Sequence, residues 1–295
     1  MAIDRRVFMK TGAGAAAAAA LADIFRAMPA LASADATGLA RHFADRGYKM
    51  VDPVDMIRPH GFNGGLLYTG LNEYHMDDPG KEPDKWFVIQ GCGRLEDLDR
   101  KHEPGVLAHF HILSFRNNAP AYPGETFDLA LGFLVRQAGF KPERLAFVST
   151  DKFKPYLKLL QPYGISESQV VYRSIDEARK AGDGSGFFSP KGHPAAPGNH
   201  CVSFHYVPEG TPLPDKLGYP PEGYFEIGEF LFESEKVPTS KLEVASFGVE
   251  RLAMARGKPA GDFESSRDSL VAKLEEEARR RGIDLPHAHR RYAEK

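Results

Sequence analysis

The stretch WFVIQGCGRLEDLDRKHEPGVLAHFHILSF, residues 86–115, decides the fold. Its first part, 86–91, is apolar and β-prone, and its last part, 106–115, alternates apolar and polar-capable residues. The intervening residues 95–105 are crowded with charge and include a proline, so they cannot form core. The pattern therefore predicts two strands joined by a charged loop.

Arg94 stands where the first of these strands gives way to the loop. A guanidinium on a rigid strand end is a good phosphate clamp, because its planar fork donates two parallel charge-assisted hydrogen bonds. Most strand–loop–strand segments with an arginine are ordinary hairpins, so Arg94 alone does not establish a function.

A second arginine occurs in a similar setting in EVASFGVERLAMARG, residues 243–257. A short β-prone run ends at Gly248, and good helix formers follow it. This places Arg251 in the first turn of a predicted helix, where a guanidinium and the helix N-terminus both favour an anion.

The rest of the chain alternates between helix and strand patterns. Helices are expected over 37–48, 122–139, 152–163, 175–181 and 266–281, and strands over 145–149, 201–207, 224–232 and 241–245. In the last helix, the acidic run 275–277 and the basic run 279–281 are expected to form a solvated face.

Residues 1–34 have the parts of a twin-arginine export signal. Arg5-Arg6 precede an apolar stretch rich in glycine and alanine, and small residues suited to cleavage follow it. We therefore expect a periplasmic or secreted protein whose single domain spans 35–295. The apolar stretch is too short for a membrane span, so none is expected after signal removal. An alanine-rich amphipathic helix is the alternative interpretation.

Composition restricts the function classes only weakly. The formal net charge of −2 gives no indication of nucleic-acid binding. The two cysteines, Cys92 and Cys201, do not make a disulfide framework, although they are able to pair after export. The eleven histidines are scattered without zinc-site spacing.

The two arginine segments resemble motifs two and three of class II aminoacyl-tRNA synthetases, and the resemblance is closest to the alanyl-tRNA synthetase catalytic domain. Several further segments resemble that family in the same order along most of the chain: LLYTG and Asn72 at 66–72, QGCGR at 90–94, FHIL at 110–113, GFKPERL at 139–145, the run from Gly164 to Val171, GNHCVSFHY at 198–206 and EIGEFLF at 226–232.

The resemblance implies an α+β fold, with an antiparallel sheet flanked by helices. It implies ATP and magnesium as cofactors and an amino acid or related carboxylate as substrate. Arg94 would hold the α-phosphate and the carboxylate, and Arg251 the γ-phosphate. Phe110 would stack on adenine, and Glu226 would hold magnesium with Glu229 near it. Members of the class often dimerise, so a homodimer is also implied.

The sequence also departs from the family pattern. His111 replaces a glutamate of motif two, and Val202-Ser203 replace a Ser-Glu pair. Val244, with Glu243 beside it, stands where an aspartate would hold the substrate ammonium. The chain has no counterpart of the family's helical tRNA-recognition region and editing domain. Alanine is therefore doubtful as substrate, and tRNA charging is not expected.

Three hypotheses remain. The first is a stand-alone ligase that activates a carboxylate with ATP, which the arginines and glutamates favour. The second is an exported, inactive pseudo-synthetase that binds a nucleotide, amino acid or other anion, which the signal and the departures favour. The third is an unrelated hydrolase or transferase, for which no triad spacing is present.

Overall fold

The computed structural model describes residues 42–51, 53, 56, 83–93, 101–102, 105–189, 198–215, 217–219, 221, 223–235, 243–258 and 261–282. The expected export signal, the 66–72 segment and Arg94 lie outside the described residues.

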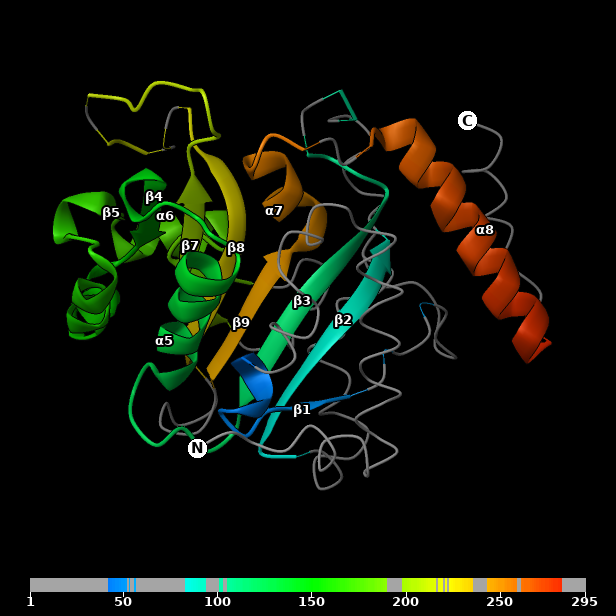
Figure 1. Cartoon of the computed structure of the whole chain (residues 1–295), viewed down its shortest axis with the longest axis horizontal. Helices are drawn as coiled ribbons and strands as arrows, with labels where there is room; N and C mark the ends of the chain where they lie inside the picture. Colours follow the sequence, from blue (N-terminus) through cyan, green and yellow to red (C-terminus); the bar gives the residue numbers. More distant parts are fainter. Residues whose placement is uncertain are drawn as a thin grey trace, which may run out of the picture.

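Nine strands of the described chain form one sheet in the order β1-β2-β3-β9-β8-β7-β4-β5, with β6 paired to β7 (Figure 1). The strands are β1 (Lys49–Met50), β2 (Lys85–Gly93), β3 (His109–Asn117), β4 (Leu145–Ser149), β5 (Val170–Tyr172), β6 (Phe187–Phe188), β7 (Asn199–Tyr206), β8 (Phe225–Ser234) and β9 (Glu243–Gly248). The hairpin expected from residues 86–115 is confirmed as the antiparallel pair β2–β3.

The expected α+β fold is confirmed, with one difference at the edges of the sheet. In the sheet order from β2 through β3, β9, β8 and β7 to β4, each strand is antiparallel to the next. At the two edges, β1 runs parallel to β2 and β5 runs parallel to β4. The chain between β4 and β5 is long enough to cross over and return in the same direction, as a parallel pair requires.

The helices α5 (Glu125–Gly132), α6 (Ile175–Ala181), α7 (Val249–Ala255) and α8 (Phe263–Arg281) accompany the sheet. Of the helix expected over 37–48, the described part is helical at 42–44 and turns at 45–47. Helix α5 continues as the π-helix η2 (Phe133–Gln137). The expected helix over 152–163 is instead two 3-10 segments, η4 (Asp151–Leu159) and η5 (Gln161–Tyr163). Pro155 lies inside η4 and Pro162 is the second residue of η5, and each lacks the backbone donor that an α-helix needs. Short 3-10 turns, η3 (Pro142–Arg144) and η6 (Glu167–Gln169), flank this region.

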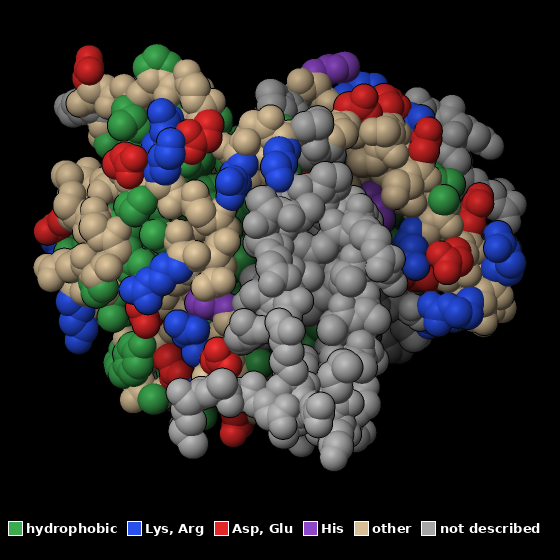
Figure 2. All heavy atoms as spheres, viewed as in Figure 1, with side chains coloured by type: hydrophobic (Ala, Val, Ile, Leu, Met, Phe, Trp, Pro, Cys, Tyr) green, Lys and Arg blue, Asp and Glu red, His purple; other side chains and the backbone are tan. Residues whose placement is uncertain are grey.

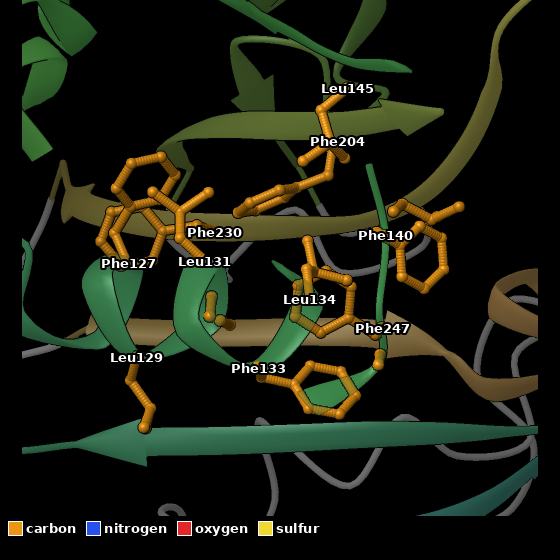
Figure 3. Close-up of a cluster of buried hydrophobic side chains, with 14 of the residues drawn as sticks. Phe127, Leu129, Leu131, Phe133, Leu134, Phe140, Leu145, Phe204, Phe230 and Phe247 are labelled. Carbon is orange, nitrogen blue, oxygen red and sulfur yellow. The ribbon is translucent and has the colours of Figure 1, made fainter. Parts of the chain in front are cut away.

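The core forms where α5 and η2 lie against one face of the sheet. Figure 3 shows Phe127, Leu131 and Leu134 directed at strand residues from β7, β8 and β9. Phe204 and Phe247 meet edge to face with ring centroids 5.2 Å apart. A Cβ at Gly228 would lie 2.3 Å from the Ser246 carbonyl oxygen, so glycine is what allows this close packing.

A buried carboxylate joins β9 to the start of α5. Glu243 is only 3% exposed, and its two carboxylate oxygens accept hydrogen bonds from the backbone N–H groups of Gly124 and Thr126. These N–H groups have no partner within the helix, and Gly124 supplies no side-chain cap. Burial raises the pKa of Glu243, while these hydrogen bonds oppose the rise.

Figure 1 shows helix α8 beside the β2–β3 hairpin, and α8 contacts β3. A second apolar cluster joins α8 to Val106 and Ala108, just before β3. Leu270 and Leu274 are buried there. The prediction of a fully solvated acidic run is wrong for Glu277, which is 3% exposed. Its position, three residues after Leu274, puts it on the packed side of the helix. No helix among the described residues is long and apolar enough to cross a membrane.

The two cysteines are buried free thiols, on β2 and β7 respectively. Burial raises the pKa of the Cys201 thiol well above its ordinary value.

We expect Glu243→Ala to lower the free energy of unfolding by about 2–3 kcal/mol, because two buried N–H groups lose their acceptor. Urea denaturation followed by circular dichroism measures this loss. Glu276→Ala, which removes a glutamate side chain 63% exposed on α8, is the matched control and is expected to change stability by less than about 0.5 kcal/mol. Equal effects of the two substitutions would contradict the capping role.

Candidate functional site

The face of the sheet opposite the phenylalanine core carries a row of polar side chains. The strand register aligns Ser114, Ser246, Glu229 and Ser203 across β3, β9, β8 and β7. Ser114 and Ser203 are fully buried, and the hydroxyl oxygens of Ser114 and Ser246 lie 3.1 Å apart. Glu229 is thus the ionisable member of an otherwise neutral row.

A second set of contacts extends this polar face along β7. The Ser203 Oγ atom lies 2.9 Å from His205 Nε2 and 3.2 Å from Ser185 Oγ. His205 is 7% exposed, and its burial lowers its pKa. The charges of Glu226 on β8 and of Asp183 raise the pKa of His205, and the charge of Arg251 on α7 lowers it.

Two of the residues expected at the site meet beside this network. Arg251, in the first turn of α7, donates from Nη1 to Glu226 Oε2 on β8 over 3.1 Å. The two side chains keep 32% and 36% of their surface exposed. An ion pair that is this accessible contributes about 1 kcal/mol or less, so a stronger anion is able to displace the carboxylate.

A short turn lies against Glu229. A Cβ at Gly184 would lie 2.8 Å from Glu229 Oε2, so the carboxylate approaches the backbone where glycine leaves room. Arg173, with its side chain 8% exposed, holds the turn by donating to Asp183 and to the Ser185 carbonyl. The Tyr219 hydroxyl also donates to Asp183, and the Arg173 guanidinium lies over the Tyr219 ring, with Arg173 Cζ 4.0 Å from the ring centroid.

Four residues of this region are not expected at a site from the sequence: Arg173, Asp183, Ser185 and His205. The segment 198–206 contains His205 as its second histidine, but the sequence resemblance gives this residue no role. Ser203, a departure from the family pattern, lies at the centre of the hydrogen-bond network.

Phe110, expected to stack on adenine, lies near the start of β3 and is half-buried. It pairs with Cys92, and strand alternation places it on the same face as Ser114. Arg94 lies outside the described residues, so the structure does not relate it to the other expected residues.

The other departures have different surroundings. Val244 is buried on β9, on the same face as Ser246, where it supplies no charge. Its neighbour Glu243 caps α5 on the opposite face, and this carboxylate therefore does not substitute for the missing one. His111 lies opposite Gly91, on the α5 side of β3, and contacts Glu250.

Lysine and arginine side chains do not gather in one place on the described part of the surface that Figure 2 shows, where they are interspersed with acidic side chains. At the site itself, the described residue Arg251 offers a single guanidinium to an anion.

Comparison with known proteins gives a structural likeness only. No family model matches the chain, and no curated protein matches it in sequence. Among solved structures, it is similar to the apo histidyl-tRNA synthetase of S. aureus, with 10% identity and a TM-score of 0.40 over 85% of this chain and 80% of that one. It is also similar to a threonyl-tRNA synthetase of Aeropyrum pernix, with 14% identity and a TM-score of 0.38 over 77% of this chain and 58% of that one. A pyrrolysyl-tRNA synthetase of Desulfitobacterium hafniense has 14% identity and a TM-score of 0.33 over 75% of this chain and 67% of that one.

We expect the free energy of unfolding to fall as the pH decreases from 7.5 to 5.5. Burial lowers the pKa values of His42, His109, His200 and His205 below 6.5 in the folded state. In this range the unfolded chain binds more protons, so falling pH favours unfolding.

His205→Gln is expected to remove about 1 kcal/mol of this pH-dependent decrease, because the substituted side chain does not titrate. Urea titrations at the two pH values measure it. His102→Gln, at an exposed histidine, serves as the control. A pH dependence identical in the wild-type and His205→Gln proteins would contradict this assignment.

Proposed function

We propose that the protein binds ATP and a small carboxylate on the polar face of the sheet and joins them as an acyl-adenylate. The observation that carries this proposal is the meeting of Arg251 and Glu226, from α7 and β8, beside the buried Ser203–His205 network. The Arg251 guanidinium, near the start of α7, is able to bind a phosphate in place of Glu226. The Glu226 carboxylate beside it is able to bind the magnesium ion that accompanies the phosphate.

The proposed reaction is a displacement at phosphorus. A carboxylate oxygen of the substrate attacks the α-phosphorus of ATP and forms a new O–P bond. The bond from this phosphorus to the bridging oxygen of the β-phosphate breaks, and pyrophosphate leaves. No atom is oxidised or reduced. Such reactions depend mainly on positioning and on neutralising charge, so arginine side chains are able to supply most of what is needed.

In this proposal Arg94 holds the α-phosphate and the attacking carboxylate, and Arg251 holds the γ-phosphate. Phe110 stacks on adenine. The resemblance of residues 86–115 and 243–257 to class II motifs two and three supports these roles, as does the position of Arg251 at the start of α7.

Glu226 and Glu229 fit magnesium by donor type, because this ion prefers carboxylate oxygens. The described residues hold no group of three or more acidic, histidine or cysteine side chains placed to bind a metal ion. Magnesium is commonly held by one or two carboxylates together with phosphates, so a smaller set is sufficient. The ion and Arg251 would compete for Glu226.

We propose an amino acid or a related carboxylate as substrate, and we do not propose alanine, because Val244 leaves no charge for an ammonium group at that position. The acceptor is proposed to be a molecule other than tRNA. Export by the twin-arginine route and homodimer formation belong to the same proposal, the first from the pattern of residues 1–34 and the second from the resemblance.

A second function is favoured by a specific observation. Arg251 is already neutralised by Glu226, and the carboxylate expected at position 244 is replaced by valine. Both features suit a protein that binds a nucleotide, an amino acid or another anion without turnover.

We expect calorimetry with magnesium to detect ATP binding by the chain that begins at Asp35, and Arg94→Ala and Arg251→Ala each to weaken it at least about tenfold. Arg179→Ala, at an exposed ion pair on α6, is the matched control and should leave binding unchanged. No binding by a folded wild-type chain would contradict both the ligase and the nucleotide-binding proposals.

Exchange of labelled pyrophosphate into ATP distinguishes the enzyme from the inactive binding protein. The enzyme catalyses this exchange when a carboxylate substrate is present, whereas the binding protein does not.

Glu226→Gln provides an independent test of the ion pair. Without magnesium, we expect this variant to bind ATP more tightly than wild type, since Arg251 no longer has a competing carboxylate. With magnesium, the advantage should shrink or reverse, because an ion ligand is lost. The same calorimetric titration with and without the metal measures both effects, and unchanged affinity under both conditions would show that the pair does not contact the nucleotide.

A further inference from the structure

Two histidines lie together at the start of β3, on the side of the sheet that faces α7 and α8. His109 and His111 are separated by one residue, so strand alternation directs both rings to the same face. Their ring centroids are 5.1 Å apart, with an angle of 45° between the planes. This is the face opposite Ser114 and Glu229, so the pair is separate from the proposed nucleotide site.

Each ring is held through its Nδ1 atom. His111 Nδ1 lies 2.8 Å from Glu250 Oε1, and Glu250 Oε2 accepts a hydrogen bond from the His111 backbone N–H, also over 2.8 Å. A carboxylate only accepts, so the neutral form of the His111 ring carries its proton on Nδ1 and has its lone pair at Nε2. His109 Nδ1 is 2.9 Å from Ser269 Oγ on α8.

The two Nε2 atoms approach one point beside Gly91. Gly91 is opposite His111 in the β2–β3 register. A Cβ built there would lie 3.4 Å from His109 Nε2 and 3.8 Å from His111 Nε2. Because glycine has no side chain, the space between the two nitrogens and β2 is not filled by residue 91.

The surroundings keep the nitrogens available. Burial is the main cause that lowers the pKa of His109 to about 4, so its ring is neutral at pH 7. The His111 side chain keeps 31% of its surface exposed, which leaves a path for a solute. The charged groups that act on His109 from neighbouring elements are Glu250 on α7 and Lys273 on α8.

We propose that the Nε2 atoms of His109 and His111 bind one transition-metal ion of the zinc, nickel or copper class, with Glu250 and Ser269 orienting the two rings. Neutral imidazole is a preferred ligand of these ions, and a ligating histidine commonly gives its other nitrogen to a carboxylate or similar acceptor. Two protein ligands leave further coordination positions to water. The site should therefore bind more weakly than a structural zinc site with four protein ligands.

The test is calorimetric titration of the untagged chain with zinc chloride or nickel sulfate alone. His287 and His289 have the same spacing in the sequence, so both are replaced by glutamine in the background protein. We expect one ion per chain, with binding weakened at least tenfold in His109→Gln and in His111→Gln. His102→Gln, which removes an exposed histidine, is the matched control and should bind as the background does.

Gly91→Ala tests the geometry without removing a ligand. Its methyl group enters the space next to both nitrogens at a position without backbone strain, so we expect weaker binding and a smaller rise in Tm on adding the metal. This variant decides the question if a histidine variant does not fold, as judged by circular dichroism. Absence of saturable binding, or binding unchanged in Gly91→Ala and the folded histidine variants, would overturn the proposal.

Discussion

The alternation of side chains along the strands is the constraint on which the rest of the structure depends. Because successive residues point to opposite faces, burying Phe204, Phe230 and Phe247 under α5 leaves Ser203, Glu229 and Ser246 on the other face. A register shift of one residue would exchange these sets. The core and the polar row are therefore specified together, and neither is free to change its position alone.

Carboxylates with different burial have different roles in this framework. Glu243 is almost fully buried and satisfies N–H groups at the start of α5, so it is structural. Glu226 is about one-third exposed and pairs with Arg251, so its contact exchanges more easily with a ligand. Glu250 takes the position that a strand partner would occupy beside His111, because β9 ends at Gly248.

The first turn of α7 connects the two faces of the sheet. Glu250 reaches His111 on β3, while Arg251, the next residue, reaches Glu226 on β8. Helical geometry separates neighbouring side chains by about 100° around the axis, so consecutive residues are able to serve different elements. The proposed metal site and the proposed nucleotide site would thus share one helical turn, although they use opposite faces.

The sequence by itself determined the local elements: the β2–β3 hairpin, the strand-to-helix change at Gly248 and the helices α5, α6 and α8. It indicated Arg251 and Glu226 through a family resemblance, but not that they pair with each other. It did not give the capping by Glu243, the burial of Glu277 or the turn around Asp183. Periodicity and turn propensity depend on neighbouring residues and are readable from the chain. The partner of a carboxylate depends on residues far apart in sequence, such as Glu243 and Gly124, and only tertiary packing brings these together.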